Sequence, residues 1–307
     1  MRAVFLALAM LLVMGCISPP PQPNQTVNNA PNQSVPANNT NHTNQTAPPQ
    51  NITQTLRIAA FNIQIFGESK RSKPGIMDVL SKTARNFDVM LVEELRDDTE
   101  TTLPFYLESI NALPGPKYAA VSSPRLGRTS SKENYAYVYN TEKVQLLSNY
   151  TFADPPNASS PDLFQREPFV ARFQSGNFSF VLIGIHTQPD DTVAEINRLP
   201  LVLDDAMQKF PSEKDFIVLG DLNADCTYLK ASDNLTLKNS SFTWVVPDSA
   251  DTTTKSTDCT YDRIILSDNE SFSGNWGVFR FDTEYGLNQS FTEQVSDHYP
   301  VWADFNP

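Results

Sequence analysis

The chain has 307 residues, 40% of them hydrophobic, with a formal net charge of −12 at pH 7 and only 11 glycines. A broadly basic nucleic-acid-binding surface is excluded, because 35 acidic residues outnumber 23 lysines and arginines; any phosphate binding must come from local arginines and bound cations. The sequence also contains no glycine-rich phosphate loop and no Gly-x-Ser-x-Gly nucleophile elbow.

Residues 1–16 predict a secretory signal peptide. Arg2 provides a positive charge, and residues 3–14 form an unbroken apolar run that is too short for a bilayer-spanning helix of about 20 residues. The run ends in Val-Met-Gly-Cys, which resembles a lipobox. We therefore expect Cys16 to be lipidated and to become the mature N-terminus; an ordinary cleaved signal with an incidental cysteine is the alternative.

Residues 17–55 predict a disordered linker. They are rich in Pro, Asn, Gln and Thr and contain no Asp, Glu, Lys or Arg, so they have too little apolar surface to offset the entropy cost of ordering. Acceptor sequences for N-glycosylation favour a glycosylated tether at an outer surface. They lie at Asn24, Asn32, Asn38, Asn41, Asn44, Asn51, Asn149, Asn157, Asn177, Asn234, Asn239, Asn269 and Asn288.

Residues 56–307 are long enough for one large domain with a sizeable core. Alternating and continuous apolar runs predict strands over 56–66, 88–95, 135–139, 144–152, 169–173, 178–187, 216–222, 261–266 and 301–305. Helical spacing of apolar residues predicts helices over 77–86, 101–113 and 192–209. Many strands with a few interspersed helices predict two packed sheets flanked by helices, an α/β sandwich.

Polar residues recur at the ends of these strands, where a site on rigid elements tends to lie. The domain has only two histidines, His186 and His298, and both occupy strand ends beside acidic segments. A polar residue at a strand end often does no more than meet solvent. Imidazoles paired with carboxylates, however, are the usual general acid and base near neutral pH. The two histidines are therefore predicted to be catalytic.

The same strand ends carry oxygen ligands for a metal. Asn62 interrupts the first strand, Glu94 ends the second, and Asp297 precedes the last one. Such hard oxygen ligands suit Mg²⁺, Mn²⁺ or Ca²⁺ rather than zinc. Histidines and cysteines at zinc-ligand spacing do not occur in the sequence.

If Cys16 carries lipid, Cys226 and Cys259 remain as a pair, and an oxidising compartment favours a disulfide between them. Two buried free thiols are the alternative.

Several segments together resemble deoxyribonuclease I, of the endonuclease/exonuclease/phosphatase superfamily. GDLN and SDHYP are typical of the superfamily, whereas REP, AEIN, ADC, DSADTT and the cysteine before TYDR are specific to the deoxyribonuclease branch. The remaining matching blocks are IAAFNIQIFGESK, LVEELRD and GRTSSKENYAY. The resemblance runs in order over about residues 56–305 and implies a four-layer αββα sandwich of two packed, mainly antiparallel sheets.

The resemblance also implies roles for individual residues. Glu94 would be the main ligand of a catalytic Mg²⁺ or Mn²⁺, with Asn62 and Asp297 nearby. The implied catalytic residues are the pairs His186–Glu133 and His298–Asp262, with Asp221 and Asn223 holding the scissile phosphate or the water. The implied phosphate contacts are Arg96, Arg166 and Tyr261, and Cys226 and Cys259 match the family's disulfide positions.

The chain departs from the family pattern at several positions. Glu93 replaces a Gln and adds a negative charge beside Glu94, and Ser131 replaces a Tyr that packs in the DNA minor groove. One structural Ca²⁺ site is expected to be intact, at Asp154, Asp162, Phe164 and Glu167. At the second family site, among Asp251, Thr253 and Thr257, Lys255 is expected to replace the cation.

These observations predict an extracellular, metal-dependent endonuclease that hydrolyses DNA to 5′-phosphate ends. The protein is expected to be a monomer without a protein partner, binding DNA nonspecifically through phosphates and anchored to the outer face of the cell membrane through Cys16. Two alternatives remain. One is a phosphodiesterase acting on RNA or on a phospholipid headgroup, as sphingomyelinases do; the other is a binding module without turnover.

Overall fold

The computed structural model describes residues 55–154 and 162–307. The predicted signal peptide, the linker, Cys16 and the acceptor Asn157 lie outside the described residues. Within the described ranges, no helix combines the length and the apolar character needed to cross a membrane.

The first sheet, sheet 1, contains both the first and the last strand of the domain. Its order is β11-β12-β1-β2-β4-β3, and only β1 and β2 run parallel. Its strands are β1 (Leu56–Phe66), β2 (Val89–Leu95), β3 (Tyr118–Ser122), β4 (Asn134–Asn140), β11 (Phe272–Val278) and β12 (Val301–Phe305).

The second sheet, sheet 2, is built from the middle of the chain. Its order is β5-β6-β7-β8-β10-β9, again with one parallel pair, β7 and β8. Its strands are β5 (Gln145–Thr151), β6 (Phe169–Ser175), β7 (Phe178–Gly184), β8 (Asp215–Asp221), β9 (Thr243–Trp244) and β10 (Asp262–Leu266).

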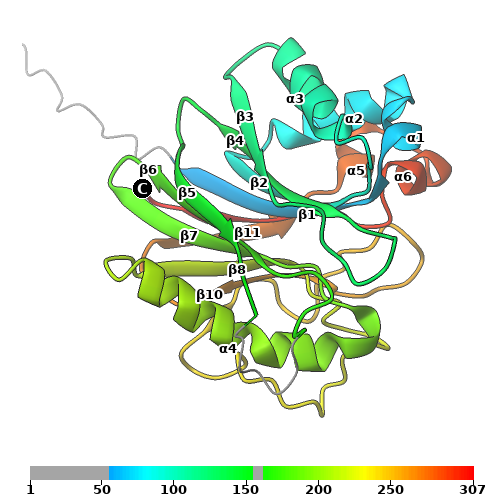
Figure 1. Cartoon of the computed structure of the whole chain (residues 1–307). Coiled ribbons are helices and arrows are strands. Elements are labelled where there is room, and N and C mark those ends of the chain that lie inside the picture. The colour runs from blue at the N-terminus through cyan, green and yellow to red at the C-terminus, as the bar shows by residue number, and fades with distance from the viewer. Residues whose placement is uncertain (1–54, 155–161) are drawn as a thin grey trace, which may run out of the picture. The chain divides into compact units, whose positions relative to one another are not determined.

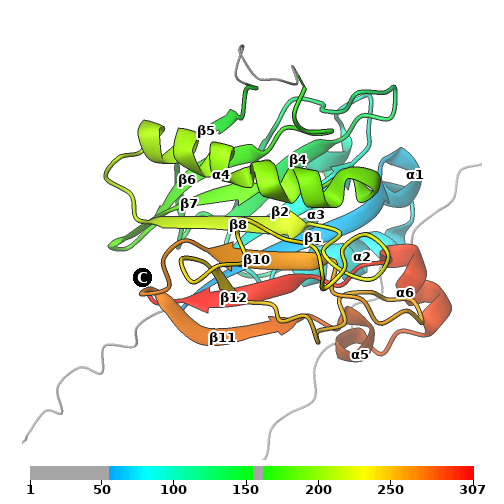
Figure 2. The ribbon, with the colours of Figure 1, turned by 90° about the horizontal axis from the view of Figure 1, so that it is seen from below.

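The two sheets pack face to face and helices cover both outer faces (Figure 1). Apolar side chains that alternate along the strands, such as Ile58, Leu91, Phe173 and Leu219, form the core between the sheets. The helix α4 (Thr192–Lys209) with the short helix η1 (Pro189–Asp191) covers sheet 2. Sheet 1 is covered by α1 (Glu68–Arg71), α2 (Pro74–Ala84), α3 (Thr102–Ala112), α5 (Phe281–Tyr285) and α6 (Gln289–Val295), as Figure 2 shows from another side. The predicted four-layer αββα sandwich is confirmed.

A disulfide joins Cys226 and Cys259, with 5.9 Å between their Cα atoms. It closes a loop of 33 residues between β8 and β10. In the chain-entropy model such a loop closure stabilises the fold by about 3–4 kcal/mol.

The topology determines where the functional side chains meet. β1 and β2 run parallel in sheet 1, and β7 and β8 run parallel in sheet 2, so the carboxyl ends of each pair lie at one edge of their sheet. The two edges face each other, because Asn62 in β1 donates a hydrogen bond across to Asp221 at the end of β8. The candidate site lies at this shared edge.

Candidate active site

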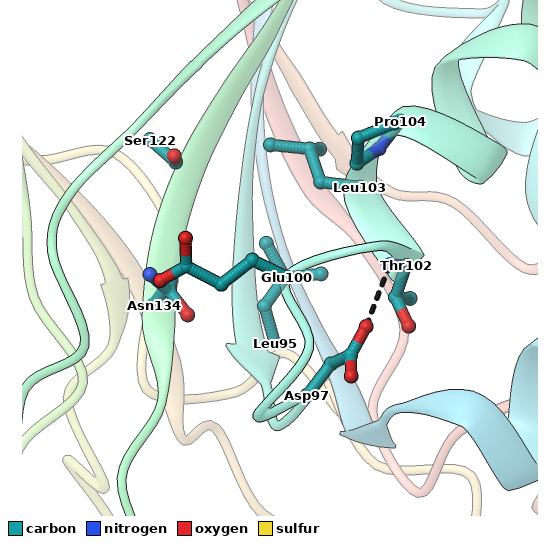
Figure 3. Close-up of a pocket in the computed structure, with 8 residues that line it drawn as sticks. All are labelled: Leu95, Asp97, Glu100, Thr102, Leu103, Pro104, Ser122 and Asn134. Atoms are coloured by element: carbon teal, nitrogen blue, oxygen red, sulfur yellow. Dashed lines mark hydrogen bonds between the residues drawn. The ribbon is translucent and has the colours of Figure 1, made fainter.

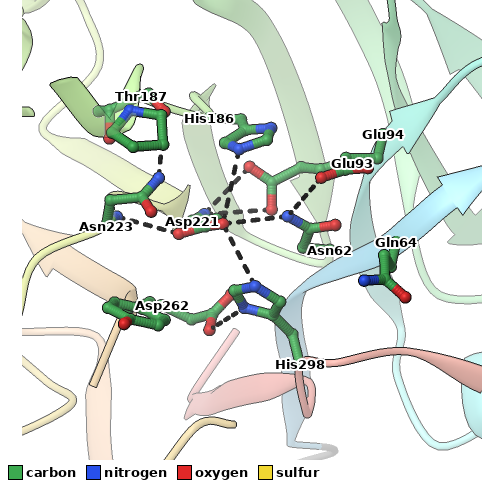
Figure 4. A network of polar contacts seen from close by, with 12 residues as sticks. Asn62, Gln64, Glu93, Glu94, His186, Thr187, Asp221, Asn223, Asp262 and His298 are labelled. Atoms are coloured by element: carbon green, nitrogen blue, oxygen red, sulfur yellow. Dashed lines mark hydrogen bonds and ion pairs between the residues drawn. The ribbon is translucent and has the colours of Figure 1, made fainter. Parts of the chain in front are cut away.

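Two histidines, each paired with a carboxylate, lie at the shared edge, and Figure 4 shows their rings on either side of Asp221. His186 follows β7, and its Nδ1 lies 2.8 Å from Glu133 Oε1. His298 precedes β12, and its Nδ1 lies 2.9 Å from Asp262 Oδ2. The Nε2 atoms of both rings lie 3.6 Å from the same atom, Asp221 Oδ2. The structure therefore brings both pairs together around one carboxylate.

Asp221 is the buried centre of this arrangement. Its Oδ2 accepts a hydrogen bond from Asn62 Nδ2 at 3.0 Å, and its Oδ1 accepts one from the backbone N–H of Asn223 at 2.9 Å. Asn223 adopts a left-handed backbone conformation, with φ of 47°, and its side chain donates to the carbonyl of Thr187. Burial alone would raise the pKa of Asp221, but the nearby His298 and His186 lower it. The carboxylate is therefore ionised between two imidazoles.

The two outer carboxylates, Glu133 and Asp262, differ in their electrostatics. Burial alone would raise the pKa of Glu133, but His186, Arg166 and Arg96 lower it to about 2. Burial alone would lower the pKa of His298, but the charges of Asp262 and Asp221 raise it well above the usual range. Burial raises the pKa of Asp262 although the charge of His298 lowers it, so Asp262 differs from Glu133 in its own protonation.

Glu93 lies directly beneath this centre and is fully buried. Both of its carboxyl oxygens accept the backbone N–H of Asp221, at 3.0 and 3.1 Å. Gly220 permits this approach, because a Cβ there would overlap the carbonyl of Ile185 and the Glu93 carboxyl group. Burial, with the charges of Asp221 and Asp262, raises the pKa of Glu93 well above the usual range. Desolvation of Glu93 therefore opposes the additional negative charge that the sequence predicts at this position.

Glu94 and Asn62 form the part of the site that is best suited to a cation. The strand register shifts between Asn62 and Phe66, and Glu94 has a φ of 59° and Ile65 a φ of 48°. This irregularity turns the Ile65 N–H toward Glu94 Oε2 at 2.7 Å. Asn62 Nδ2 lies 3.4 Å from Glu94 Oε1, while the buried Asn62 Oδ1 has no hydrogen-bond partner within the described residues. A buried acceptor without a donor, beside a carboxylate, fits a divalent cation.

Asp297, the third predicted ligand, has its own hydrogen-bond partners. Its Oδ2 accepts hydrogen bonds from Gln64 Nε2 at 2.8 Å and from Lys255 Nζ at 3.1 Å. Its Oδ1 lies 3.9 Å from His298 Nε2. Asp221, Asp262 and His298 form a further group of possible metal ligands, because each places a ligand atom within 4.8 Å of the other two. Carboxylate oxygens thus extend from Glu94 across the centre to Asp297.

The predicted phosphate contacts differ in accessibility. Arg96 is 29% exposed, and its Nε lies 3.3 Å from Glu94 Oε2 and 3.4 Å from Glu133 Oε2. Arg166 is only 8% exposed; its Nε lies 3.1 Å from Glu133, and it also donates to the carbonyls of His186 and Thr187. Arg96 is therefore open to a substrate, whereas Arg166 holds Glu133 from behind.

An aromatic row borders the site on the other side. The ring of Tyr261 lies 6.0 Å from that of His298 and 5.6 Å from that of Tyr228. Tyr228 is 37% exposed and was not identified from the sequence. It belongs to no strand or helix, so no periodic pattern marked it.

A small cavity of about 140 Å³ lies near the site, behind the loop that follows β2 (Figure 3). Leu95, Asp97, Glu100 and Asn134 contribute to its lining. Asp97 accepts the backbone N–H of Thr102 at 2.7 Å and thereby fixes the start of α3. None of the predicted catalytic or metal-binding residues lines this cavity, so the chemistry belongs to the open edge between the sheets.

The residues of the expected structural calcium site also converge. Asp154, Asp162 and Glu167 each place an oxygen within 4.8 Å of the others, and Phe164 is fully buried beside them in the chain. Burial, and then the charges of Asp154 and Asp162, raise the pKa of Glu167. Mutual repulsion of this kind is relieved by a bound cation.

The expected position of Lys255 is wrong. Asp251, Thr253 and Thr257 contact one another: the Thr253 N–H donates to Asp251 Oδ1, and the single Thr253 hydroxyl hydrogen can be donated either to Asp251 Oδ1 or to the Thr257 carbonyl. The Lys255 ammonium pairs with Asp297 instead. Thr253, rather than the Lys255 ammonium, therefore provides the hydrogen bonds to the Asp251 carboxylate.

Comparison with known proteins agrees with this geometry. Residues 59–298 match the model of the Endonuclease/Exonuclease/phosphatase family. Deoxyribonuclease-1 of Ovis aries is 39% identical over 256 residues, covering 80% of this chain and 98% of that protein. Deoxyribonuclease gamma of Homo sapiens is 39% identical over 259 residues, covering 80% and 84%.

A solved structure supports the fold in the same way. An endonuclease/exonuclease/phosphatase family protein from Bacteroides thetaiotaomicron superposes with a TM-score of 0.57 at 17% identity. The match covers 82% of this chain and 97% of that one. At this identity the likeness concerns the sandwich fold alone.

Proposed function

Because the chain belongs to the endonuclease/exonuclease/phosphatase family and is a deoxyribonuclease, we propose that it is an extracellular, divalent-metal-dependent endonuclease that cuts DNA to 5′-phosphate ends. One observation carries the proposed chemistry: the Nε2 atoms of His186 and His298 lie 3.6 Å from Asp221 Oδ2. Each ring is held by a second carboxylate on its Nδ1. This is the arrangement that a general acid and a general base acting on one phosphate require.

In the proposed reaction, water attacks the phosphorus atom and the bond to the 3′ oxygen breaks. One imidazole accepts the proton of the water, and the other donates a proton to the leaving 3′ oxygen. Glu133 and Asp262 keep Nδ1 of each ring engaged, so that Nε2 faces the reacting atoms. Asp221 and Asn223 position the water or the phosphate, and Arg96 offsets charge on the non-bridging oxygens.

Glu94 and Asn62 are the residues proposed to hold Mg²⁺ or Mn²⁺, with Asp297 nearby. The Asn62 amide beside Glu94 supports this assignment, because its Oδ1 has no hydrogen-bond partner among the residues that the structure describes. When bound, such a cation supplies positive charge to the phosphate oxygens.

A second substrate class has one observation in its favour. Ser131, where the family has an aromatic side chain for the DNA minor groove, is exposed and offers no stacking surface. Together with the net charge of −12, this keeps RNA or a phospholipid headgroup as the alternative substrate.

Nicking of supercoiled plasmid separates these functions. We expect relaxation of the plasmid with Mg²⁺ and Ca²⁺ and none with EDTA. Parallel reactions contain single-stranded RNA or sphingomyelin vesicles at the same phosphodiester concentration. Faster hydrolysis of either one would replace deoxyribonuclease as the main activity, and equal cleavage in EDTA would remove the metal from the proposal.

We further propose that residues 1–16 direct secretion, that Cys16 anchors the chain to the outer face of the membrane, and that residues 17–55 tether a monomeric domain of residues 56–307. The apolar run and the lipobox-like end support this arrangement. Wild-type protein should partition into a detergent phase, and the Cys16→Ser variant should not. Wild-type protein that stays in the aqueous phase would contradict the anchor.

One structural Ca²⁺ is proposed at Asp154, Asp162 and Glu167, with the Phe164 carbonyl as a further oxygen. Calcium at a hundredfold excess over its Kd should then stabilise the fold by about 2.7 kcal/mol, or raise the Tm by about 5–10 °C in a domain of this size. The Asp162→Ala variant should lose most of this calcium-dependent shift in a thermal melt.

Asp251→Ala is the matched control, because its carboxylate is already satisfied by Thr253. It should keep most of the shift. Comparing each variant with and without calcium removes the separate effect of breaking the ion pair between Asp162 and Arg128. Two tightly bound calcium ions in calorimetry, or a shift that survives Asp162→Ala, would contradict a single site.

A further inference from the structure

Lys255 occupies a fixed position at the rim of the candidate site. The preceding residue, Thr254, donates from its N–H to the carbonyl of Asp297 at 2.9 Å and from its hydroxyl to the carbonyl of Ser296 at 2.8 Å. Thr253 pairs with His298 in an isolated β-bridge. The backbone that carries Lys255 is therefore fastened to the segment that carries His298.

The ammonium group of Lys255 remains accessible to solvent. Its Nζ lies 3.1 Å from Asp297 Oδ2, and the Lys255 side chain is 52% exposed. An ion pair this exposed contributes only about 0–1 kcal/mol to stability. A weak pair can also exchange its partner at little cost, so the ammonium is free to meet another anion.

The negative charges around the site explain why a positive charge at Lys255 would help a polyanion to bind. Glu94, Asp221 and Asp262 lie around the two histidines in Figure 4, and Asp297 lies 3.9 Å from His298 Nε2, so a phosphate bound at the histidines would meet four carboxylates. A polyanion approaching them needs local positive charge, which the acidic chain as a whole does not supply. Arg96 supplies it beside Glu94 and Glu133, on the side of His186. Lys255 lies on the other side, next to Asp297 and His298.

We propose that Lys255 binds the phosphate that neighbours the scissile phosphodiester on the Asp297 side of the site. This inference rests on the proposed function, since it assumes a nucleic-acid strand lying between Arg96 and Lys255. Phosphates recur at every nucleotide, so a strand held at the two histidines presents its next phosphate to one of these flanking cations. Lys255 contributes to substrate binding, whereas the histidines contribute to the chemical step.

Salt dependence of DNA binding tests this proposal directly. Anisotropy of a labelled duplex with non-hydrolysable backbone linkages, in Mg²⁺ and Ca²⁺, gives the Kd between about 50 and 200 mM salt. Lys255→Ala should weaken binding about three- to tenfold at low salt and reduce the slope of log K against log salt by about 0.9, the value for one lost phosphate contact. Lys255→Arg should keep the wild-type slope, because it keeps the charge.

Lys82→Ala is the matched control. Lys82 Nζ pairs with Asp78 at 2.7 Å on α2. Its side chain is 47% exposed, which is close to the 52% of Lys255, and its partner is likewise an aspartate. Lys82 lies near the end of α2, a few residues before β2 begins at Val89. The candidate site lies at the other end of β2, near Glu94, so Lys82 is remote from it. Its removal should leave the salt slope at the wild-type value.

A second substrate separates phosphate binding from an effect through Asp297. The ratio of kcat/KM for duplex DNA to kcat/KM for bis(p-nitrophenyl) phosphate, which has no neighbouring phosphate, should fall about three- to tenfold in Lys255→Ala. An unchanged salt slope would overturn the proposal, as would an equal loss on both substrates or a change only in the Mg²⁺ concentration needed for activity. Failure of the proposed function would look different, because wild-type protein would then leave duplex DNA uncut.

Discussion

Replacing either His186 or His298 with alanine is expected to lower kcat on duplex DNA by at least about a hundredfold, since general acid–base groups contribute about 10²–10⁴. Each imidazole presents its Nε2 to the same Asp221 oxygen and has its Nδ1 held by a buried carboxylate. Water at that position cannot reproduce a proton acceptor or donor held in this way. Initial rates of plasmid nicking under saturating DNA measure the effect.

The third histidine of the chain provides a matched control. His42 lies in the proposed linker, and His42→Ala should cleave at the wild-type rate. A thermal melt of each variant distinguishes loss of chemistry from loss of folding. If a folded His186→Ala or His298→Ala protein cleaves DNA at a near-normal rate, that histidine has no part in the proton transfers.

Loss of the Glu94 carboxylate is expected to be equally severe. Hydrogen-bond partners of metal ligands typically contribute 10–100-fold to metal affinity or activity, so loss of the ligand itself should lower both by at least about a hundredfold. Glu94 accepts the Ile65 N–H and lies 3.4 Å from the amide nitrogen of Asn62, whose Oδ1 has no hydrogen-bond partner in the part of the chain that the structure describes. Titration of Glu94→Ala with Mn²⁺, followed by electron paramagnetic resonance, measures affinity independently of turnover.

Glu142→Ala controls for the loss of one negative charge. Glu142 is exposed and lies just after the end of β4. At this end of β4, Tyr139 pairs with Val89, the first residue of β2. That edge is opposite the one that carries Glu94, so Mn²⁺ affinity should not change. If Glu94→Ala binds Mn²⁺ as tightly as wild type does, the catalytic cation must lie elsewhere, for example among Asp221, Asp262 and His298.

The regular elements with strong apolar patterns could be predicted from the sequence. β1 and α4 begin and end where the pattern predicts, because each has an almost continuous buried face. β11 and β3 were missed for the opposite reason. β11 contains two glycines and is nowhere fully buried, and β3 has one buried residue. Edge strands of this kind depend on hydrogen bonds to a neighbour, which leave little trace in local composition.

The site required information that local patterns do not contain. Glu133 precedes a strand of sheet 1 and His186 follows a strand of sheet 2, 53 residues later, so only the resemblance to the family indicated their pairing. Simple alternation would send Glu93 and Glu94 to opposite faces. Instead, the left-handed conformation at Glu94 lets both serve the same edge, one beneath Asp221 and one beside Asn62.

Sequence proximity was misleading for Lys255. It lies four positions from Asp251 in the chain, yet its ammonium pairs with Asp297, 42 positions away. Thr253 donates to Asp251, and the hydrogen bonds of Thr254 to Asp297 and Ser296 hold the neighbouring Lys255 near the last strand. A position interpreted as a substitute for calcium is therefore part of the candidate active site.

Cleavage of DNA in water labelled with heavy oxygen tests the central claim most directly. If two histidines around Asp221 direct water onto the phosphorus and release the 3′ oxygen, each cut made by the wild-type protein places one labelled oxygen on a 5′-phosphate and leaves the 3′-hydroxyl unlabelled. Mass spectrometry of the products reads this label. Label on a 3′-phosphate, products without label, or uncut DNA in the presence of Mg²⁺ and Ca²⁺ would contradict the account.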